Sequence, residues 1–213
     1  MLKGSLERMT RELEDNRAPR RMRADARQKM TALLEAALEV FAKSGVNAPV
    51  REIAEKAGVG LGTVYRHFPQ RSDLIVAVLQ KGADSCAEAA AVLPAKYGPG
   101  EALTRWIHLF MDFIASKRGL ATALQSGDPA YAALPTYFSS RMVPALKSLL
   151  ETASEAKLIR PDVDAFDLLR TIVALCQGPN EEEPPYARKM VGVLVDGMRF
   201  GATDKIGRRR ASK

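Results

Sequence analysis

The chain has 213 residues, of which 46% are hydrophobic and only 6% aromatic, and it carries a formal net charge of +7. This composition supports a buried core, disfavours a sheet protein because strands are enriched in β-branched and aromatic residues, and favours polyanionic partners such as nucleic acid. No apolar run approaches the roughly 20 residues that span a bilayer, so we expect no membrane partner. The two cysteines, Cys86 and Cys176, make neither a disulfide scaffold nor a metal site, which favours the reducing cytoplasm.

Basic residues gather at both ends of the chain. Between positions 17 and 30, and again from 199 to the end, arginine and lysine outnumber acidic residues. We therefore expect a basic N-terminal extension over 1–23, whose first 16 residues fit either an amphipathic helix or a frayed segment, and a basic disordered tail over 201–213. Only the first of these basic ends adjoins a motif.

Between the two ends, apolar residues recur at helical spacing, and this pattern predicts an all-α protein. Gly45 is expected to end the first helix, and Gly58 to separate two short ones. Pro69 ends the third helix, because proline disfavours helical geometry in the residue before it. Pro135 and Pro144 lie inside one long helical pattern and predict that it is divided. Helices are predicted at 24–44, 50–57, 61–68, 72–97, 101–116, 117–126, 129–156, 164–177 and 185–200.

The two short helices predicted at 50–57 and 61–68 are joined by a turn that contains Gly58. A short helix, a glycine-containing turn and a second short helix form the outline of a helix-turn-helix, since glycine adopts the left-handed conformation that the sharp turn needs. Any fold with two short helices has this outline, so the side chains on the second helix carry the more specific signal.

One set of side chains on this second helix suits the phosphate oxygens of a nucleic acid. Thr63 and Tyr65 offer hydroxyls, His67 offers a ring N–H, and Arg71 follows just beyond with a full charge. Each of them also has a less specific interpretation, as a half-buried packing residue for Tyr65 and His67 or as a solvated surface charge for Arg71. The whole set, within one short segment behind a basic arm, favours the nucleic-acid interpretation.

Two arginines suit the edges of bases, and the start of the second short helix suits an anion. Arg51 and Arg66 carry forked donors that match the acceptor pair of guanine. Leu61 and Gly62 begin the second short helix, where backbone N–H groups face an anion and the missing side chain of Gly62 permits a close approach. Solvated surface arginines are the alternative interpretation of Arg51 and Arg66.

The stretch over residues 50–74, VREIAEKAGVGLGTVYRHFPQRSDL, resembles the DNA-binding signature of the TetR/AcrR family of transcriptional regulators. The preceding EAALEVFAKSG, at 35–45, is similar to the end of the family's first helix. The resemblance covers about residues 24–74 and is specific. It departs from the family at Gly60, where serine is a frequent helix cap, and at Arg71, where lysine is frequent; glycine is a tolerable cap and arginine keeps the charge.

This resemblance implies a homodimer that places each recognition helix in a major groove of a palindromic operator in double-stranded DNA. It implies that phosphates are held by Thr63, Tyr65, His67 and Arg71. It assigns to base-facing positions Arg51, Leu61, Gly62 and Arg66. The basic arm before residue 24 would then follow a minor groove or flank the backbone.

The rest of the chain, from about 80 to 200, has no catalytic, cofactor-binding or metal-binding pattern, so an enzyme is not expected. Small-ligand pockets are mostly apolar with a few polar groups, and His108 lies among apolar residues of one predicted helix. A lone histidine there is more often a satisfied core residue than a ligand contact. The candidate ligand-binding residues are Trp106, His108, Phe110, Met111, Tyr137, Phe138, Arg141, Met142 and Cys176.

The last two predicted helices, 164–177 and 185–200, are apolar on more than one side. A helix that is apolar nearly all round must be buried on both sides, which two such helices achieve against a two-fold partner in a four-helix bundle. The domain prediction is accordingly a three-helix DNA-binding domain over 24–71 and a helical effector-binding and dimerisation domain over 72–200.

Two hypotheses of function follow. In the first, the chain is a repressor that an unidentified small-molecule effector releases from its operator, which requires the effector to bind two conformations differently. In the second, the chain binds DNA constitutively, has a filled core and is controlled by a partner protein. A cavity lined by Trp106, His108 and their neighbours would favour the first.

Overall fold

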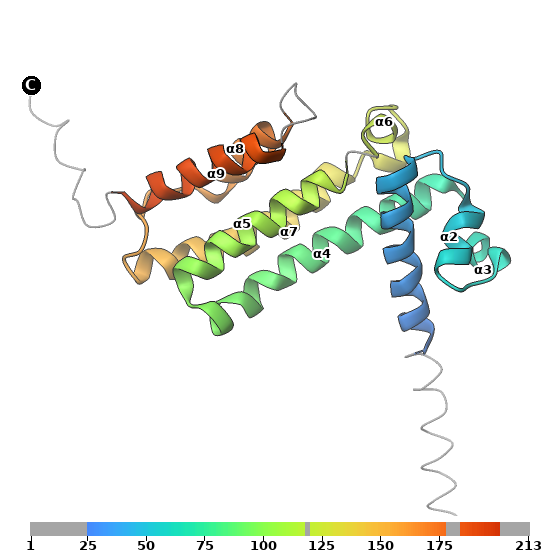
Figure 1. The fold of residues 1–213 in the computed structure, drawn as a ribbon, viewed down its shortest axis with the longest axis horizontal. Helices are drawn as coiled ribbons and strands as arrows, with labels where there is room; N and C mark the ends of the chain where they lie inside the picture. Colours follow the sequence, from blue (N-terminus) through green and yellow to red (C-terminus); the bar gives the residue numbers. More distant parts are fainter. Residues whose placement is uncertain (1–24, 118–119, 178–183, 201–213) are drawn as a thin grey trace, which may run out of the picture. The chain divides into compact units, whose positions relative to one another are not determined.

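The computed structural model describes residues 25–117, 120–177 and 184–200, and every regular element in these ranges is a helix (Figure 1). The predicted all-α fold is therefore confirmed. The chain divides into two compact units after Leu74, close to the boundary expected at 71. None of the described helices is long and apolar enough to cross a membrane. The predicted extension over 1–23 and tail over 201–213 lie outside the described residues.

The first unit is built from three helices and the start of a fourth. A helix over residues 25–44 comes first. It is followed by α2 (Val50–Lys56), α3 (Leu61–His67) and the first residues of α4 (Arg71–Tyr97). Large apolar side chains from all of them meet in one core, in which Phe41, Ile53 and Leu74 are at most 1% exposed. This core fixes the two short helices, which are too short to be stable alone.

The turn between α2 and α3 has the predicted geometry. Gly58 adopts a φ of +66°, in the left-handed region. The N–H of Val59 then donates to the Ala54 carbonyl at 3.0 Å, which closes the turn. Gly60 precedes α3 as an extended residue and makes no side-chain cap. The loop before α2 starts in the same way, since Gly45 has a φ of +75° and ends the first helix as predicted.

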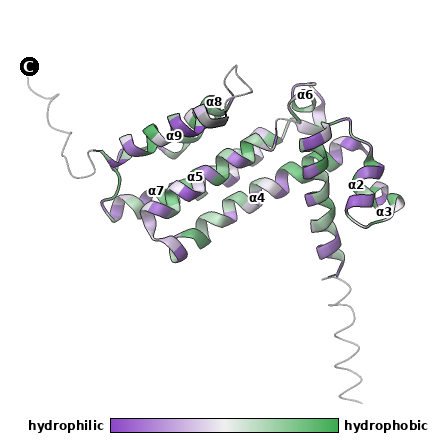
Figure 2. Ribbon diagram, viewed as in Figure 1, coloured by the Kyte–Doolittle hydropathy of each residue, from purple (hydrophilic) through white to green (hydrophobic). Residues whose placement is uncertain are grey.

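The second unit is a bundle of long helices. Its elements are α4, α5 (Pro99–Ala115), α6 (Ala121–Leu124), the 3₁₀ turn η2 (Pro129–Tyr131), α7 (Leu134–Glu155), α8 (Ala165–Cys176) and α9 (Pro184–Arg199). Helix α5 packs on α7 and α8, and α8 also packs on α9. The long helices carry hydrophobic and hydrophilic bands (Figure 2), and the inward band of α5 includes the fully buried Trp106 and Ile107.

Two helices differ from their sequence predictions. The helix expected over 129–156 is divided, but near its start: η2 ends at Tyr131, and α7 begins at Leu134 with Pro135 in its first turn. Pro144 lies inside α7 without ending it, because the packing of the helix outweighs the lost backbone hydrogen bond of about 3 kcal/mol or more. Of the helix expected over 117–126, the described part contains only α6.

Candidate functional site

Six of the residues predicted to contact DNA lie on α3, and the other two, Arg51 and Arg71, lie on α2 and at the start of α4. Tyr65 is 50% exposed and Leu61 is 40% exposed, although both are large and apolar for most of their surface. Arg66 and His67 are exposed as well. The inner face of α3 is filled instead by Val64, which is 1% exposed, so the exposure of Tyr65 and His67 favours the nucleic-acid interpretation over the packing one.

The beginning of α3 is open to an approaching molecule. A Cβ built on Gly62 would meet no atom within 4 Å, so nothing inside the protein requires a glycine there. Thr63 follows and is half-buried. The free space around Gly62 leaves the backbone accessible at this end of α3, next to the exposed side chain of Leu61.

The two arginines that flank these helices have different surroundings. Arg51 on α2 is 80% exposed and pairs with Glu55 at 3.0 Å, a surface ion pair of little energetic weight that DNA can replace. Arg71 is half-buried, and its Nη1 donates to the carbonyl oxygens of Val46 and of Ala48, the latter at 2.8 Å. Arg71 therefore also ties the loop before α2 to the start of α4, a structural role that sequence reasoning did not find.

A cavity of about 920 Å³ opens among α5, α7 and α8 of the second unit. Its lining includes Phe110, Phe113, Lys117, Phe138, Ser139, Met142, Phe166, Leu169, Arg170, Val173, Cys176 and Gln177. Four of the predicted ligand residues are among them, namely Phe110, Phe138, Met142 and Cys176. The lining is mostly apolar with a few polar groups, as in small-molecule sites.

The other predicted ligand residues do not line this cavity. Trp106 is fully buried, and its Nε1 donates to the Cys86 carbonyl at 2.8 Å, so its polar group is already satisfied within the core. His108 is half-buried and Met111 is buried in the core, and neither is among the lining residues. These three residues of α5 therefore belong to the packed part of the bundle and not to the cavity wall. The periodicity of a helix alone does not distinguish these two environments.

Tyr137 and Arg141 are also outside the lining, and both bind the same carboxylate on α4. The Tyr137 hydroxyl donates to Asp84 Oδ1 at 2.8 Å, and Arg141 Nε donates to the same oxygen at 2.6 Å. Burial, together with this hydrogen bond, raises the pKa of Tyr137. The trio joins α7 to α4 next to the cavity residue Phe138.

Helix α4 also touches the cavity wall through a glycine. A Cβ on Gly82 would lie 2.9 Å from Cε2 of Phe113, so only a glycine lets α4 approach this ring so closely. Phe113 also lines the cavity. The wall of the cavity is thus in direct contact with α4.

Lys117 is a cavity residue that sequence reasoning missed. Its Nζ lies 3.5 Å from the centroid of the Phe113 ring and 3.8 Å from that of Phe138. Burial lowers its pKa from 10.5 to about 7. The sequence gives no signal for this placement, because Lys117 follows the predicted end of a helix, where a solvated charge is the usual outcome.

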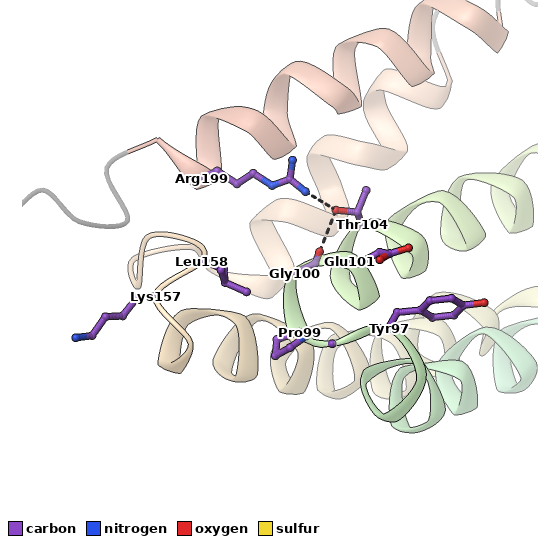
Figure 3. A pocket seen from close by; sticks show the side chains of 9 residues that line it. Tyr97, Pro99, Gly100, Glu101, Thr104, Lys157, Leu158 and Arg199 are labelled. Carbon is purple, nitrogen blue, oxygen red and sulfur yellow. Dashed lines mark hydrogen bonds between the residues drawn. The ribbon is translucent and has the colours of Figure 1, made fainter.

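A second hollow, of about 630 Å³, lies where α4 meets α5 (Figure 3). Arg199 reaches across it and donates from Nη2 to Thr104 Oγ1 at 3.1 Å, and this hydroxyl donates in turn to the Gly100 carbonyl at 3.1 Å. Two of its polar side chains, Arg199 and Thr104, therefore bind one another, and Tyr97 is the one aromatic residue of its described lining.

Each of the two units contains a region that matches a model of a known protein family. Residues 33–78 match the model of bacterial regulatory proteins of the tetR family. Residues 98–200 match the model of the C-terminal domain of SbtR-like transcriptional regulators. The first match contains α2 and α3, and the second contains the cavity.

Individual proteins show the same relationship. A TetR transcriptional regulator of Streptomyces coelicolor is 31% identical, with a TM-score of 0.69 over 79% of this chain and 97% of that chain. A gamma-butyrolactone receptor described as ArpA-like is 27% identical, with a TM-score of 0.55 over 82% of this chain and 90% of that chain. An HTH-type transcriptional regulator of Staphylococcus aureus strain USA300 is 41% identical over 64 residues, which span 30% of this chain but only 35% of that relative.

The regulator from Streptomyces is matched over nearly its whole length, so the relationship extends beyond the DNA-binding unit. The family consists of DNA-binding regulators and not of enzymes, in agreement with the expectation from the sequence. The chain belongs to the TetR family of DNA-binding transcriptional regulators.

Proposed function

We propose that the protein is a homodimeric repressor that binds a palindromic operator through α3 and leaves it when a small molecule enters the cavity of the second unit. Residues 24–71 would form the DNA-binding domain and residues 72–200 the effector and dimerisation domain, and the protein would act in the cytoplasm. The observation that carries the proposal is the exposed outer face of α3, with Leu61 and Tyr65 unburied beside Arg66.

The roles of the residues on this face follow from their chemistry. Hydroxyl, imidazole and guanidinium groups donate hydrogen bonds to phosphate oxygens and so position the protein on the DNA backbone. Arginine guanidinium groups can also donate two hydrogen bonds to the edge of a base, which makes binding sequence-specific. Phosphate contacts are assigned to Thr63, Tyr65, His67 and Arg71. Base-facing positions are assigned to Arg51, Leu61, Gly62 and Arg66. Arg71 has N–H groups beyond the one nitrogen that binds the loop carbonyls, so both of its roles are compatible.

Dimerisation is assigned to α8 and α9. Phe166 on α8 is 46% exposed, and Tyr186 and Val193 on α9 are 53% and 62% exposed. Large apolar side chains exposed on neighbouring helices mark an interaction surface, and a two-fold axis lets the same two helices of each copy cover one another. This supports the four-helix bundle expected from the sequence.

The cavity favours release by an effector over the filled core of the alternative hypothesis. Its volume of about 920 Å³ lies in the range of small-molecule sites. A relative of similar structure is a gamma-butyrolactone receptor. A ligand against Phe113 would press on α4 at Gly82, and α4 begins at Arg71, so this helix is the element through which the ligand would act on the DNA-binding unit.

The test is a gel shift on the DNA directly upstream of the protein's own gene, with excess random duplex and with Tyr65→Phe as the matched variant. We expect a complex that resists the competitor and is weakened by Tyr65→Phe, which removes one hydroxyl from an exposed position. Sedimentation of the same protein should show a dimer, which Val193→Asp dissociates. Equal affinity for operator and random DNA would contradict the proposal.

A further inference from the structure

The charges in the cavity of the second unit are all of one sign. Lys117 and Arg170 line it, together with the uncharged polar residues Gln125, Ser139 and Gln177, and none of its described lining residues is acidic. The remaining lining is apolar apart from the thiol of Cys176. A cavity of this kind complements a molecule with an apolar body and negative charge.

Lys117 is the cation that lies deepest among the rings. Its Nζ stands within 4 Å of the centroids of Phe113 and Phe138. Within the described residues, no carboxylate forms an ion pair with it. A buried ammonium needs an opposite charge or full hydrogen bonding to offset its lost hydration, and two ring faces replace only part of that loss.

An ammonium has three donors, and the rings do not accept all of them. Because Lys117 lines the cavity, its ammonium can donate to a group that enters there. The attraction between a carboxylate and this ammonium would be much stronger in the cavity than at the protein surface, because the dielectric constant is low there. The ammonium is also already desolvated and held in place by the rings.

We propose that the effector is an amphipathic monoanion, whose carboxylate pairs with Lys117 and whose apolar body lies against Phe110, Phe138 and Met142. This inference rests on the proposed release by a small molecule, for which it names the chemical class. Arg170 is exposed and stands at the rim, where it attracts the anion without being its final partner.

The protein contains its own reporter for this site. Trp106 is the single tryptophan of the chain. Its ring stacks on that of Phe110, with centroids 5.6 Å apart and an angle of 8° between the planes, and Phe110 lines the cavity. Displacement of Phe110 by a ligand therefore changes the surroundings of Trp106, and its fluorescence can be followed in the full chain without a label.

The experiment is a fluorescence titration of the full chain with decanoate and with 1-decanol, which share an apolar body and differ in the charge of the head group. We expect decanoate to bind about tenfold or more tightly than decanol, because only the carboxylate pairs with Lys117. Lys117→Met should remove this preference and leave decanol binding nearly unchanged. Lys117→Arg should retain it, since the charge is kept.

The matched control is Lys147→Met, which removes a lysine that is 67% exposed and pairs with Glu151 outside the cavity. It should bind both compounds as the unmodified chain does. Equal affinity for decanoate and decanol in the unmodified chain, or no binding of decanoate, would overturn the proposal. A preference for decanoate that survives in Lys117→Met would also overturn it.

A parallel titration of the complex with fluorescent operator separates this inference from the proposed function. If decanoate binds at Lys117 but leaves operator binding unchanged, the ligand class stands and release by an effector fails. If decanol releases the operator as well as decanoate does, release stands and the anion inference fails.

Discussion

The outer face of α3 and the cavity of the second unit differ in how far their polar side chains are exposed to solvent. On α3 the functional side chains are exposed and hydrated, so they cost the fold little; Tyr65 and Leu61 are the extreme cases. In the cavity, Lys117 is half-buried against two rings, and this desolvation disfavours its charged form as long as no anion pairs with it. Removal of an exposed side chain on α3 should therefore change DNA binding without lowering stability, whereas variants around the cavity should change stability and ligand binding together.

The largest effect is expected at Trp106, which forms the core behind the cavity. Trp106→Ala removes a fully buried ring and its hydrogen bond to the Cys86 carbonyl, and should lower the free energy of unfolding by about 3–5 kcal/mol. Denaturation in urea, followed by circular dichroism, measures this loss. His108→Ala, at a half-buried site on the same helix, is the matched control and should cost much less.

On α3 the expected effect is large for binding and absent for stability. Arg66→Ala should cost about 1–3 kcal/mol of operator affinity and relax the specificity at one base pair, because it removes a guanidinium group that hydrogen-bonds to a base edge. The midpoint of urea denaturation should not move, since Arg66 is exposed. Competition binding with operator and random duplex provides the measurement, and equal losses on both would refute the base-reading role.

The buried charge of Lys117 predicts how stability depends on pH. Its folded pKa is lowered from 10.5 to about 7 by burial, so above pH 7 the unfolded chain binds more protons and the free energy of unfolding rises with pH. Burial raises the pKa of Cys86 from 9.0 to about 12, which acts in the opposite direction above pH 9. Between pH 7 and 9 we expect a gain on the order of 1–2 kcal/mol from Lys117.

Urea denaturation at pH 7, 8 and 9 measures this gain, and Lys117→Met is the variant that should abolish it. Lys147→Met should keep it, because that lysine is exposed. A gain of the same size in Lys117→Met would place its origin at another group. At pH 7 Lys117→Met should also be the more stable protein, since it no longer buries a charge.

The same contrast explains which features the sequence could predict. The face of α3 is one short helix behind a turn, so its side-chain neighbours follow from helical geometry, and the turn at Gly58 was predicted with its left-handed conformation. The helices of the second unit were also predicted nearly to the residue, except for the division near Pro135 and the short α6. Both features depend on local spacing.

The cavity depends on contacts between helices that are distant in the sequence, and there local spacing is not sufficient. Trp106 and Phe110 lie one helical turn apart on α5, yet Trp106 belongs to the core and Phe110 to the cavity wall. Lys117 becomes a cavity residue only because Phe138 of α7 lies over it. Arg71 likewise acquired a structural role through carbonyl oxygens more than 20 positions away, a partnership that no periodicity indicates.

A small gain in stability, together with a loss of operator affinity, is expected for Gly62→Ala. A Cβ at this position meets no atom within 4 Å, and the backbone is helical, so alanine should raise the free energy of unfolding by up to about 1 kcal/mol through its higher helix propensity. Yet the new methyl group lies where the backbone would approach DNA, and operator affinity should fall. Thermal denaturation and operator titration of the same variant measure both. If affinity were unchanged, Gly62 would not face the bases and α3 would dock in another orientation; a loss of both stability and affinity would mean that the site is packed, contrary to the free space around it.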